Sequence, residues 1–325
     1  MTERAHILFF VFLFFAALVN AGPPFSGTIF LDGDVITDQD LTSYLGMEFK
    51  GQENRQMYDR RVSEWIINKA FLFQARFDDG LEIEVQVNSE FQNESSALRV
   101  AEKYLPSIGR LPNSLRQDVK TIWIHKGDKP FGGGNNNLLI HDIQGDRYIS
   151  SFILEETFVH EASHTSLDRN HAKSSGWVLA QKQDPNFIST YARDNPTRED
   201  VAESFLPFLA LEYREDRIPI RISSQIRNTI PNRLEYFRGI NWDLHPFVPR
   251  KIIISKWKYH NDLGKITLFW SSLLERTYQI EESTDLIHWQ NIGGEIKSEG
   301  LISDQTLSFS ETVEGRFYRV RRVRE

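Results

Sequence analysis

One short stretch, His160-Glu161-Ala162-Ser163-His164, constrains the fold of this chain more than any other. The apolar residues around it recur with helical spacing, so we predict a helix from Ile149 to about Leu167. Ser150 and Ser151 are suited to cap its first turn, because serine side chains accept hydrogen bonds from free N–H groups there. The buried side of this helix is expected to consist of Phe152, Phe158, Val159 and Ala162.

Residues four positions apart lie on the same face of a helix, so His160 and His164 can direct two imidazoles at one metal ion. The chain has no cysteine, and a metal site must therefore consist of histidines and carboxylates. Glu161 lies beside the pair and can accept a proton from a water molecule without binding the metal. This pattern predicts a hydrolytic centre with one Zn²⁺ ion and Glu161 as general base. The alternative is an amphipathic helix with two partly buried histidines, which the uncharged neighbours disfavour.

The residues themselves leave the third metal ligand open. A metzincin would have glycine at Leu167 and histidine at Asn170, and this chain has neither. Asp168 lies on the same face as His164 and is better placed to accept a hydrogen bond from that imidazole than to reach the metal.

Glu199 and Glu203 are one turn apart on a second predicted helix, which begins near Asn195-Pro196-Thr197 and runs to about Tyr213. Thr197 and Asp200 have capping-box spacing, and Pro207 is expected to bend the helix. Two carboxylates at this spacing suit a metal ligand and a partner that holds a histidine ligand. They suit a solvated acidic face equally well.

The run from Ser189 to Phe205, STYARDNPTREDVAESF, follows HEASHTSLD at residues 160–168. Together these motifs, within residues 150–212, resemble the zinc peptidase domain of the anthrax lethal factor and Pro-Pro endopeptidase group. The resemblance implies that Glu199 is the third zinc ligand, that Glu203 is the acid behind a ligand, and that Tyr191 donates a hydrogen bond to the oxyanion of the transition state. Tyr191 lies eight residues before Glu199, one more than in the family pattern.

The resemblance, together with the remaining pattern of helices and strands, implies an α+β, zincin-like catalytic domain with an active-site helix, a mixed sheet and a second ligand-bearing helix. Alternating residues predict strands at 28–31, 81–87, 119–125 and 138–141, and helices are expected at 96–105 and 112–118. Residues 58–76 give a mixed signal, with helical spacing up to Lys69 and strand alternation from Phe71.

The glycine- and asparagine-rich loop at 130–137 is either a surface hairpin tip or one rim of the substrate cleft. In the second interpretation an edge strand pairs with an extended substrate. The residues expected to contact that substrate are Gly133, Asn135, Asn136 and Leu138.

The sequence pattern changes near residues 242–250, an unstructured stretch that contains two prolines. We place a domain boundary there, between a catalytic domain (22–245) and a C-terminal all-β sandwich (246–325). Short alternating runs predict its strands, at 252–257, 265–270, 277–282, 289–292, 306–309 and 316–323. Residues 277–289 and 316–320 resemble fibronectin-like modules that end many exported bacterial proteins, which implies a spacer or a unit for cell-surface attachment.

Residues 1–21 have the pattern of a signal peptide: Arg4, an apolar run from Ile7 to Val19, and the small-x-small triplet Val19-Asn20-Ala21. We expect export to the periplasm, the cell surface or the medium, with a retained anchor as the alternative and no further membrane span. The net charge of −7 over 325 residues disfavours nucleic acid as a partner.

These observations favour an exported zinc endopeptidase acting on a peptide or protein substrate. The main alternative is a catalytically silent zincin-fold protein used for binding or adhesion. A zinc hydrolase acting on a non-peptide amide is a third hypothesis.

Overall fold

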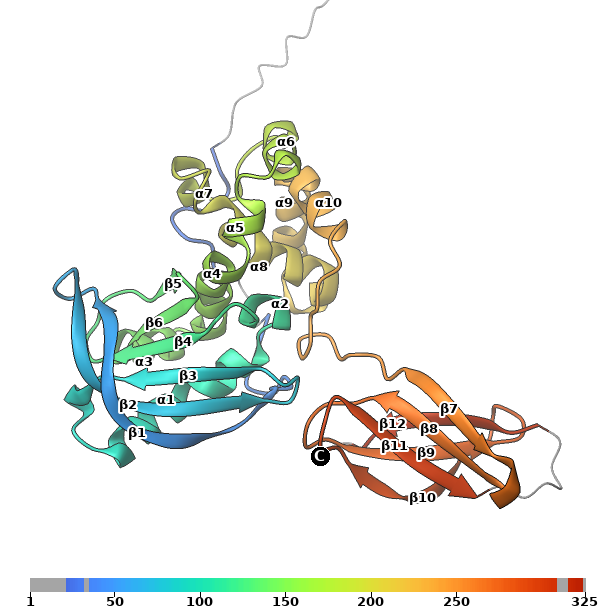
Figure 1. Cartoon of the computed structure of the whole chain (residues 1–325). Coiled ribbons are helices and arrows are strands. Elements are labelled where there is room, and N and C mark those ends of the chain that lie inside the picture. Colours follow the sequence, from blue (N-terminus) through green and yellow to red (C-terminus); the bar gives the residue numbers. More distant parts are fainter. Residues whose placement is uncertain (1–21, 32–34, 309–314, 324–325) are drawn as a thin grey trace, which may run out of the picture.

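The computed structural model describes residues 22–31, 35–308 and 315–323 (Figure 1). It has an α+β part with a six-stranded mixed sheet, followed by two separate three-stranded antiparallel sheets. The predicted signal peptide lies outside the described residues. Within the described part of the chain, no helix combines the length and apolar character that a membrane crossing requires.

The large sheet has the strand order β1-β2-β3-β4-β6-β5. Strands β3, β4 and β6 run parallel, and the other neighbouring pairs are antiparallel. The bounds are β1 (Tyr44–Asp59), β2 (Glu64–Phe77), β3 (Glu82–Val87), β4 (Thr121–His125), β5 (Gly132–Gly134) and β6 (Asn137–His141). The predicted strands at 81–87, 119–125 and 138–141 are therefore confirmed, whereas the long strand β1 was not predicted.

Strand β2 resolves the mixed signal of residues 58–76 in favour of a strand from Glu64 onward. In its second half both faces are buried: Phe71 and Phe73 pack in the main core under the helices, while Ala70 and Leu72 pack in a smaller cluster on the opposite face. The helix-like spacing lies in the part up to Lys69, where both faces of β2 are largely exposed and apolar residues such as Trp65 and Ile67 do not mark a buried face. The strand predicted at 28–31 is wrong, because the amides of this segment bind carboxylate side chains instead of another strand.

The helices are α1 (Glu94–Arg110), α2 (Asn113–Arg116), α3 (Asp142–Ser150), α4 (Leu154–Ser166), α5 (Asp168–His171), α6 (Ser175–Gln183), α7 (Thr190–Asp194), α8 (Asp200–Tyr213), α9 (Ile220–Thr229) and α10 (Pro231–Arg238). Helices α1, α3 and α4 pack against the sheet, and other helices of the α+β part extend the main core away from it (Figure 1). Helix α4 packs against both the edge strand β5 and helix α8. The helices predicted at 96–105 and 112–118 are confirmed as α1 and α2.

The helix predicted from Ile149 to Leu167 is in fact two helices, α3 and α4, separated at Phe152. Phe152 has a φ of +57° and is 79% exposed, so its predicted burial is wrong. The predicted serine caps are also wrong, since Ile153 precedes α4 and its side chain makes no capping bond. A non-glycine residue in the left-handed region cannot continue a helix, which accounts for the break.

The second predicted helix begins later than expected. Helix α8 starts at Asp200, with Glu199 as its N-cap, and the turn at 196–199 precedes it. The capping box at Thr197 is therefore wrong, whereas the end at Tyr213 and the position of Pro207 inside the helix are confirmed. Because of this later start, Glu199 lies at the N-terminus of α8, as its N-cap, and not within the helix.

All six predicted C-terminal strands are confirmed, as β7 (Ile254–His260), β8 (Lys265–Ser271), β9 (Thr277–Ser283), β10 (Gln290–Lys297), β11 (Ile302–Ser308) and β12 (Phe317–Arg322). They form the sheets β10-β9-β12 and β11-β8-β7. Their shared core includes Trp270, Tyr278 and Ile280.

The buried carboxylate of Asp78, in the β2–β3 turn, joins the C-terminal sheets to the α+β part. Its Oδ1 lies 2.7 Å from Nε2 of His245, and its Oδ2 accepts a hydrogen bond of 2.9 Å from Nε of Arg276. The Leu274 amide also donates to the main-chain oxygen of Asp78 at 2.7 Å. The attachment thus lies at the β2–β3 turn, remote from α4 and α8 (Figure 1).

Two fully buried histidines, His125 and His141, pair across β4 and β6, with ring centroids 5.6 Å apart. Burial lowers the pKa of both, that of His141 to about 4. Asp59 favours the protonated form of each ring, whereas Arg61 opposes it. The folded protein therefore keeps both rings neutral down to a lower pH than the unfolded chain does.

We expect this pair to make the free energy of unfolding fall as the pH drops from about 6.5, the ordinary histidine pKa, toward about 4. Over that range the unfolded chain binds protons that the folded protein does not. His141→Phe, which loses no hydrogen bond because both ring nitrogens lack a partner, should weaken this dependence. Urea unfolding of the wild type and the variant at pH 7.5 and pH 5 measures this pH dependence. If the free energy of unfolding changes between the two pH values by the same amount in both proteins, the prediction is contradicted.

Candidate metal centre

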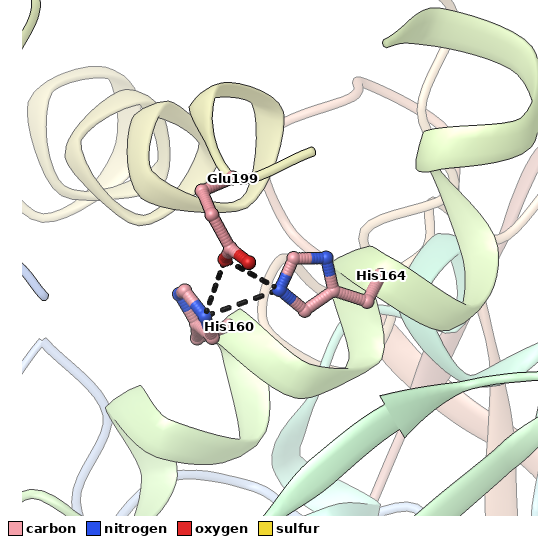
Figure 2. Close-up of side chains that lie close together, drawn as sticks. All are labelled: His160, His164 and Glu199. Carbon is pink, nitrogen blue, oxygen red and sulfur yellow. Dashed lines mark hydrogen bonds and ion pairs between the residues drawn. The ribbon is translucent and has the colours of Figure 1, made fainter. Parts of the chain in front are cut away.

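Three side chains from α4 and the start of α8 converge on one point (Figure 2). His160 and His164 are one turn apart on α4, and Glu199 directly precedes α8. The Nε2 atoms of His160 and His164 are 3.2 Å apart. Glu199 Oε2 lies 3.0 Å from His164 Nε2 and 3.5 Å from His160 Nε2. Each residue offers one ligand atom, and these atoms all lie within 4.8 Å of one another, so the three residues form a candidate metal-binding triad.

The other ring nitrogen of each histidine faces a carboxylate. His164 Nδ1 lies 2.7 Å from Asp168 Oδ2, and His160 Nδ1 lies 3.3 Å from Glu203 Oε1. A carboxylate only accepts hydrogen bonds, so it favours the tautomer with the proton on Nδ1. This leaves the lone pair of each Nε2 directed toward the common point.

Glu199 Oε2 fits the same interpretation. The atom is buried and has no hydrogen-bond donor of acceptable geometry, although two imidazole nitrogens lie within 3.5 Å. Buried carboxylate oxygens without a donor are costly, and a cation between the three atoms would satisfy this one. The residues present therefore fit a divalent metal with nitrogen and oxygen ligands.

The cluster is strongly polarised without a metal. Burial opposes the charged form of His164, but the Asp168 and Glu199 carboxylates outweigh it and raise its pKa to about 10. In the same way, His160 and His164 outweigh burial and hold the pKa of Glu199 well below its usual range. The site thus stabilises positive charge at its centre, which a proton supplies in the absence of a metal cation.

The triad opens into a cavity of about 530 Å³. Glu161 lines it beside the three ligand candidates, as do Thr157 one turn earlier on α4 and Asp168. The structure thus brings the two histidines, Glu161 and Glu199 to one cavity, with Glu203 buried behind His160.

Strand β5 lies against α4 at Glu161. A Cβ atom on Gly133 would come within 1.7 Å of the Glu161 main-chain oxygen, so only glycine permits this approach. The Gly134 amide donates to Thr165 Oγ1 at 2.8 Å, which fixes the strand to the same helix. The free edge of the sheet therefore runs directly beside the triad.

The four predicted cleft residues have different positions. Gly133 lines the cavity, and Asn135 lines an adjoining cavity of about 290 Å³. Asn136 and Leu138 line neither of these two cavities. Asn135 and Asn136 form a two-residue turn with φ of +51° and +57°, which lets the Asn136 side chain donate to Asp118, and Leu138 points into the core.

Tyr191 lies on the short helix α7, which Ser189 caps by accepting a hydrogen bond from the Ala192 amide. Its ring stacks on His160 with a centroid separation of 6.4 Å, and it lines the cavity while remaining 36% exposed. Burial and the Glu199 carboxylate raise the pKa of Tyr191 to about 12, so its hydroxyl keeps its proton at neutral pH.

Several residues around the cavity were not predicted, namely Thr28, Phe30, Arg60, Tyr148 and Arg198, whereas Phe131 belongs to the loop at 130–137 that was given as a possible cleft rim. Arg60 lies in the β1–β2 turn and donates to the Phe131 main-chain oxygen at 2.6 Å. Only the alternation at 28–31 gave a signal in the sequence, and it indicated a strand rather than a cleft wall.

No family model matches this chain, and no curated protein matches it. Among solved structures, aminopeptidase A of Legionella pneumophila in complex with aspartic acid aligns with 85% of this chain and 42% of its own length. The identity is 9% and the TM-score 0.20, values at which the likeness carries no argument about fold or activity. The functional assignment therefore depends on the site itself.

Proposed function

We propose that this chain is an exported zinc-dependent endopeptidase. The observation that carries the proposal is the convergence of His160 Nε2, His164 Nε2 and Glu199 Oε2 beside Glu161, in a cavity bordered by the sheet edge. Zinc is the ion that this ligand set suits best, because two imidazoles and a carboxylate form the protein half of many hydrolytic zinc sites.

Zinc bound there would supply Lewis acidity and lower the pKa of a coordinated water to about 7. Glu161 would accept the proton of the attacking water and pass it to the leaving amine. The Tyr191 hydroxyl, protonated at neutral pH, would donate a hydrogen bond to the oxygen of the scissile carbonyl. The edge strand β5 would pair with an extended stretch of substrate.

The resemblance to the lethal factor and Pro-Pro endopeptidase group supports a zincin-like assignment for the α+β part. The residues of its HExxHxxxD and ExxAExF motifs contribute a common cluster: His160, His164, Asp168, Glu199 and Glu203. In this proposal Glu199 is the third ligand, whereas Asp168 and Glu203 orient the two imidazoles. The C-terminal module is proposed as a spacer or cell-surface unit, because the cavity lining includes none of its described residues.

Replacement of the proposed general base tests the activity directly. We expect Glu161→Gln to retain zinc and to lower kcat by about 10²–10⁴-fold, because proton transfer contributes on that order. Cleavage of a broad peptide library by the exported, zinc-loaded protein measures this, and metal analysis checks the zinc content. A wild-type protein that holds zinc and cleaves no peptide would favour the binding or adhesion hypothesis.

Metal affinity tests the choice of ligand. Glu199→Ala removes a ligand atom and should weaken zinc binding far more than Asp168→Ala, which removes only the partner of His164 Nδ1 and should cost about 10–100-fold. Competition with a chromogenic chelator measures both dissociation constants. Equal zinc affinity in the two variants would show that Glu199 does not bind the metal.

A further inference from the structure

Residues 25–31 run beside the metal centre, with a bend at Gly27 and Thr28, and contact α4, α7 and α8. The Phe25 amide donates to the Ile188 oxygen at 3.2 Å, and the Thr190 amide donates to the Phe25 oxygen at 2.9 Å. The Gly27 amide donates to Thr190 Oγ1 at 2.8 Å. These bonds hold the segment against the start of α7, the helix that carries Tyr191.

The inner side of the segment binds the two helices of the site. The Ile29 amide donates to Glu203 Oε2 at 2.9 Å, and the Leu31 amide donates to Glu156 Oε2 at 2.9 Å. Glu203 belongs to α8 and Glu156 to α4, and all four residues are buried. Burial raises the pKa of Glu203, whereas His160, the Ser189 hydroxyl and the Ile29 amide each favour the ionised carboxylate.

The second oxygen of Glu203 connects this contact to the metal centre. Oε1 lies 3.3 Å from Nδ1 of His160, while Oε2 binds the Ile29 amide. The Ile29 amide, together with the Ser189 hydroxyl, therefore holds the carboxylate that faces the imidazole of a candidate metal ligand. Such outer partners affect metal affinity because they set the tautomer and the direction of the ligand.

The outer side of the segment faces the cavity. Thr28 and Phe30 line it, whereas the intervening Ile29 and the following Leu31 are buried in the core. Alternate residues of the segment thus lie on different sides, with Ile29 and Leu31 in the core and Thr28 and Phe30 at the cavity.

We propose that residues Thr28–Leu31 form a functional wall of the metal cleft, whose inner side positions His160 through Glu203 and whose outer side contacts the substrate through Phe30. The substrate half rests on the proposed peptidase function, and the positioning half requires only that the site binds zinc. Strand β5 and this segment then border the same cavity from different parts of the chain.

The positioning half is tested with two variants at one residue. Ile29→Pro removes the N–H that binds Glu203, whereas Ile29→Ala keeps it and removes a comparable apolar contact. We expect Ile29→Pro to weaken zinc binding by about 3–10-fold in chelator competition, with Ile29→Ala changing it less than twofold. Unfolding of the zinc-free proteins measures the purely structural cost of each variant. Equal zinc affinities in the two folded variants would overturn the positioning role.

The substrate half is tested with Phe30→Ala, and Phe25→Ala is the matched control. Phe25 belongs to the same segment but does not line the cavity. The probe is a leucine-containing peptide hydroxamate, which binds the zinc-loaded protein without being cleaved. Phe30→Ala should raise its dissociation constant about 3–30-fold at unchanged zinc content and alter residue preference in a peptide library, whereas Phe25→Ala should do neither.

The hydroxamate separates the two proposals. If the wild type binds it in a Phe30-dependent way but cleaves no peptide, the cleft wall stands and the endopeptidase assignment fails. If the wild type cleaves peptides and Phe30→Ala leaves both hydroxamate affinity and residue preference unchanged, the substrate role of the wall fails. A zinc-loaded wild type that does not bind the hydroxamate would also overturn that role.

Discussion

The site depends on the electrostatic balance between two imidazoles and the carboxylates around them. Burying several carboxylates in one place is unfavourable unless positive charge or hydrogen-bond donors compensate. Here Asp168 and Glu203 face the Nδ1 atoms, and Glu199 faces both Nε2 atoms. The arrangement places the negative charge on three sides of one point, and a divalent cation at that point would offset most of it. This favours the candidate metal-binding triad over a structural ion pair.

Glu199 can play its part only if the start of α8 is fixed, and a second buried network achieves this. Asp200 follows Glu199 directly, and its Oδ2 accepts hydrogen bonds from Arg233 Nε at 2.9 Å and from Gln181 Nε2 at 3.0 Å. The Arg233 guanidinium also contacts the Asp184 carboxylate at 3.0 Å, so α6 and α10 are tied to the same point. Removing one partner of such a buried pair is costly, which makes these distant helices part of the support of the metal ligand.

The sequence revealed those parts of the site that depend on helical spacing. His160, Glu161, His164 and Asp168 occupy one helix face and its continuation, so their proximity follows from local geometry. The relation of α4 to α8 does not follow from spacing, and Glu199 was assigned only through a resemblance. The break at Phe152 and the late start of α8 also escaped the pattern, because both depend on main-chain conformations that apolar periodicity does not encode. The all-β character of the C-terminal part was easier to recognise from the sequence, because each of its strands is short and bounded by turn residues.

Main-chain contacts account for the features that no sequence pattern could reveal. The approach of β5 to α4 is possible because Gly133 lacks a Cβ, and the sequence indicated a hairpin tip or a cleft rim here but not the contact with α4. The wall at Thr28–Leu31 is fixed by amides that bind Glu203 and Glu156, and an amide is present at every residue except proline. Specificity in such a cleft therefore depends on which side chains the fixed backbone presents. On this wall they are Thr28 and Phe30, which makes Phe30, with the larger apolar surface, the side chain that should discriminate most between substrates.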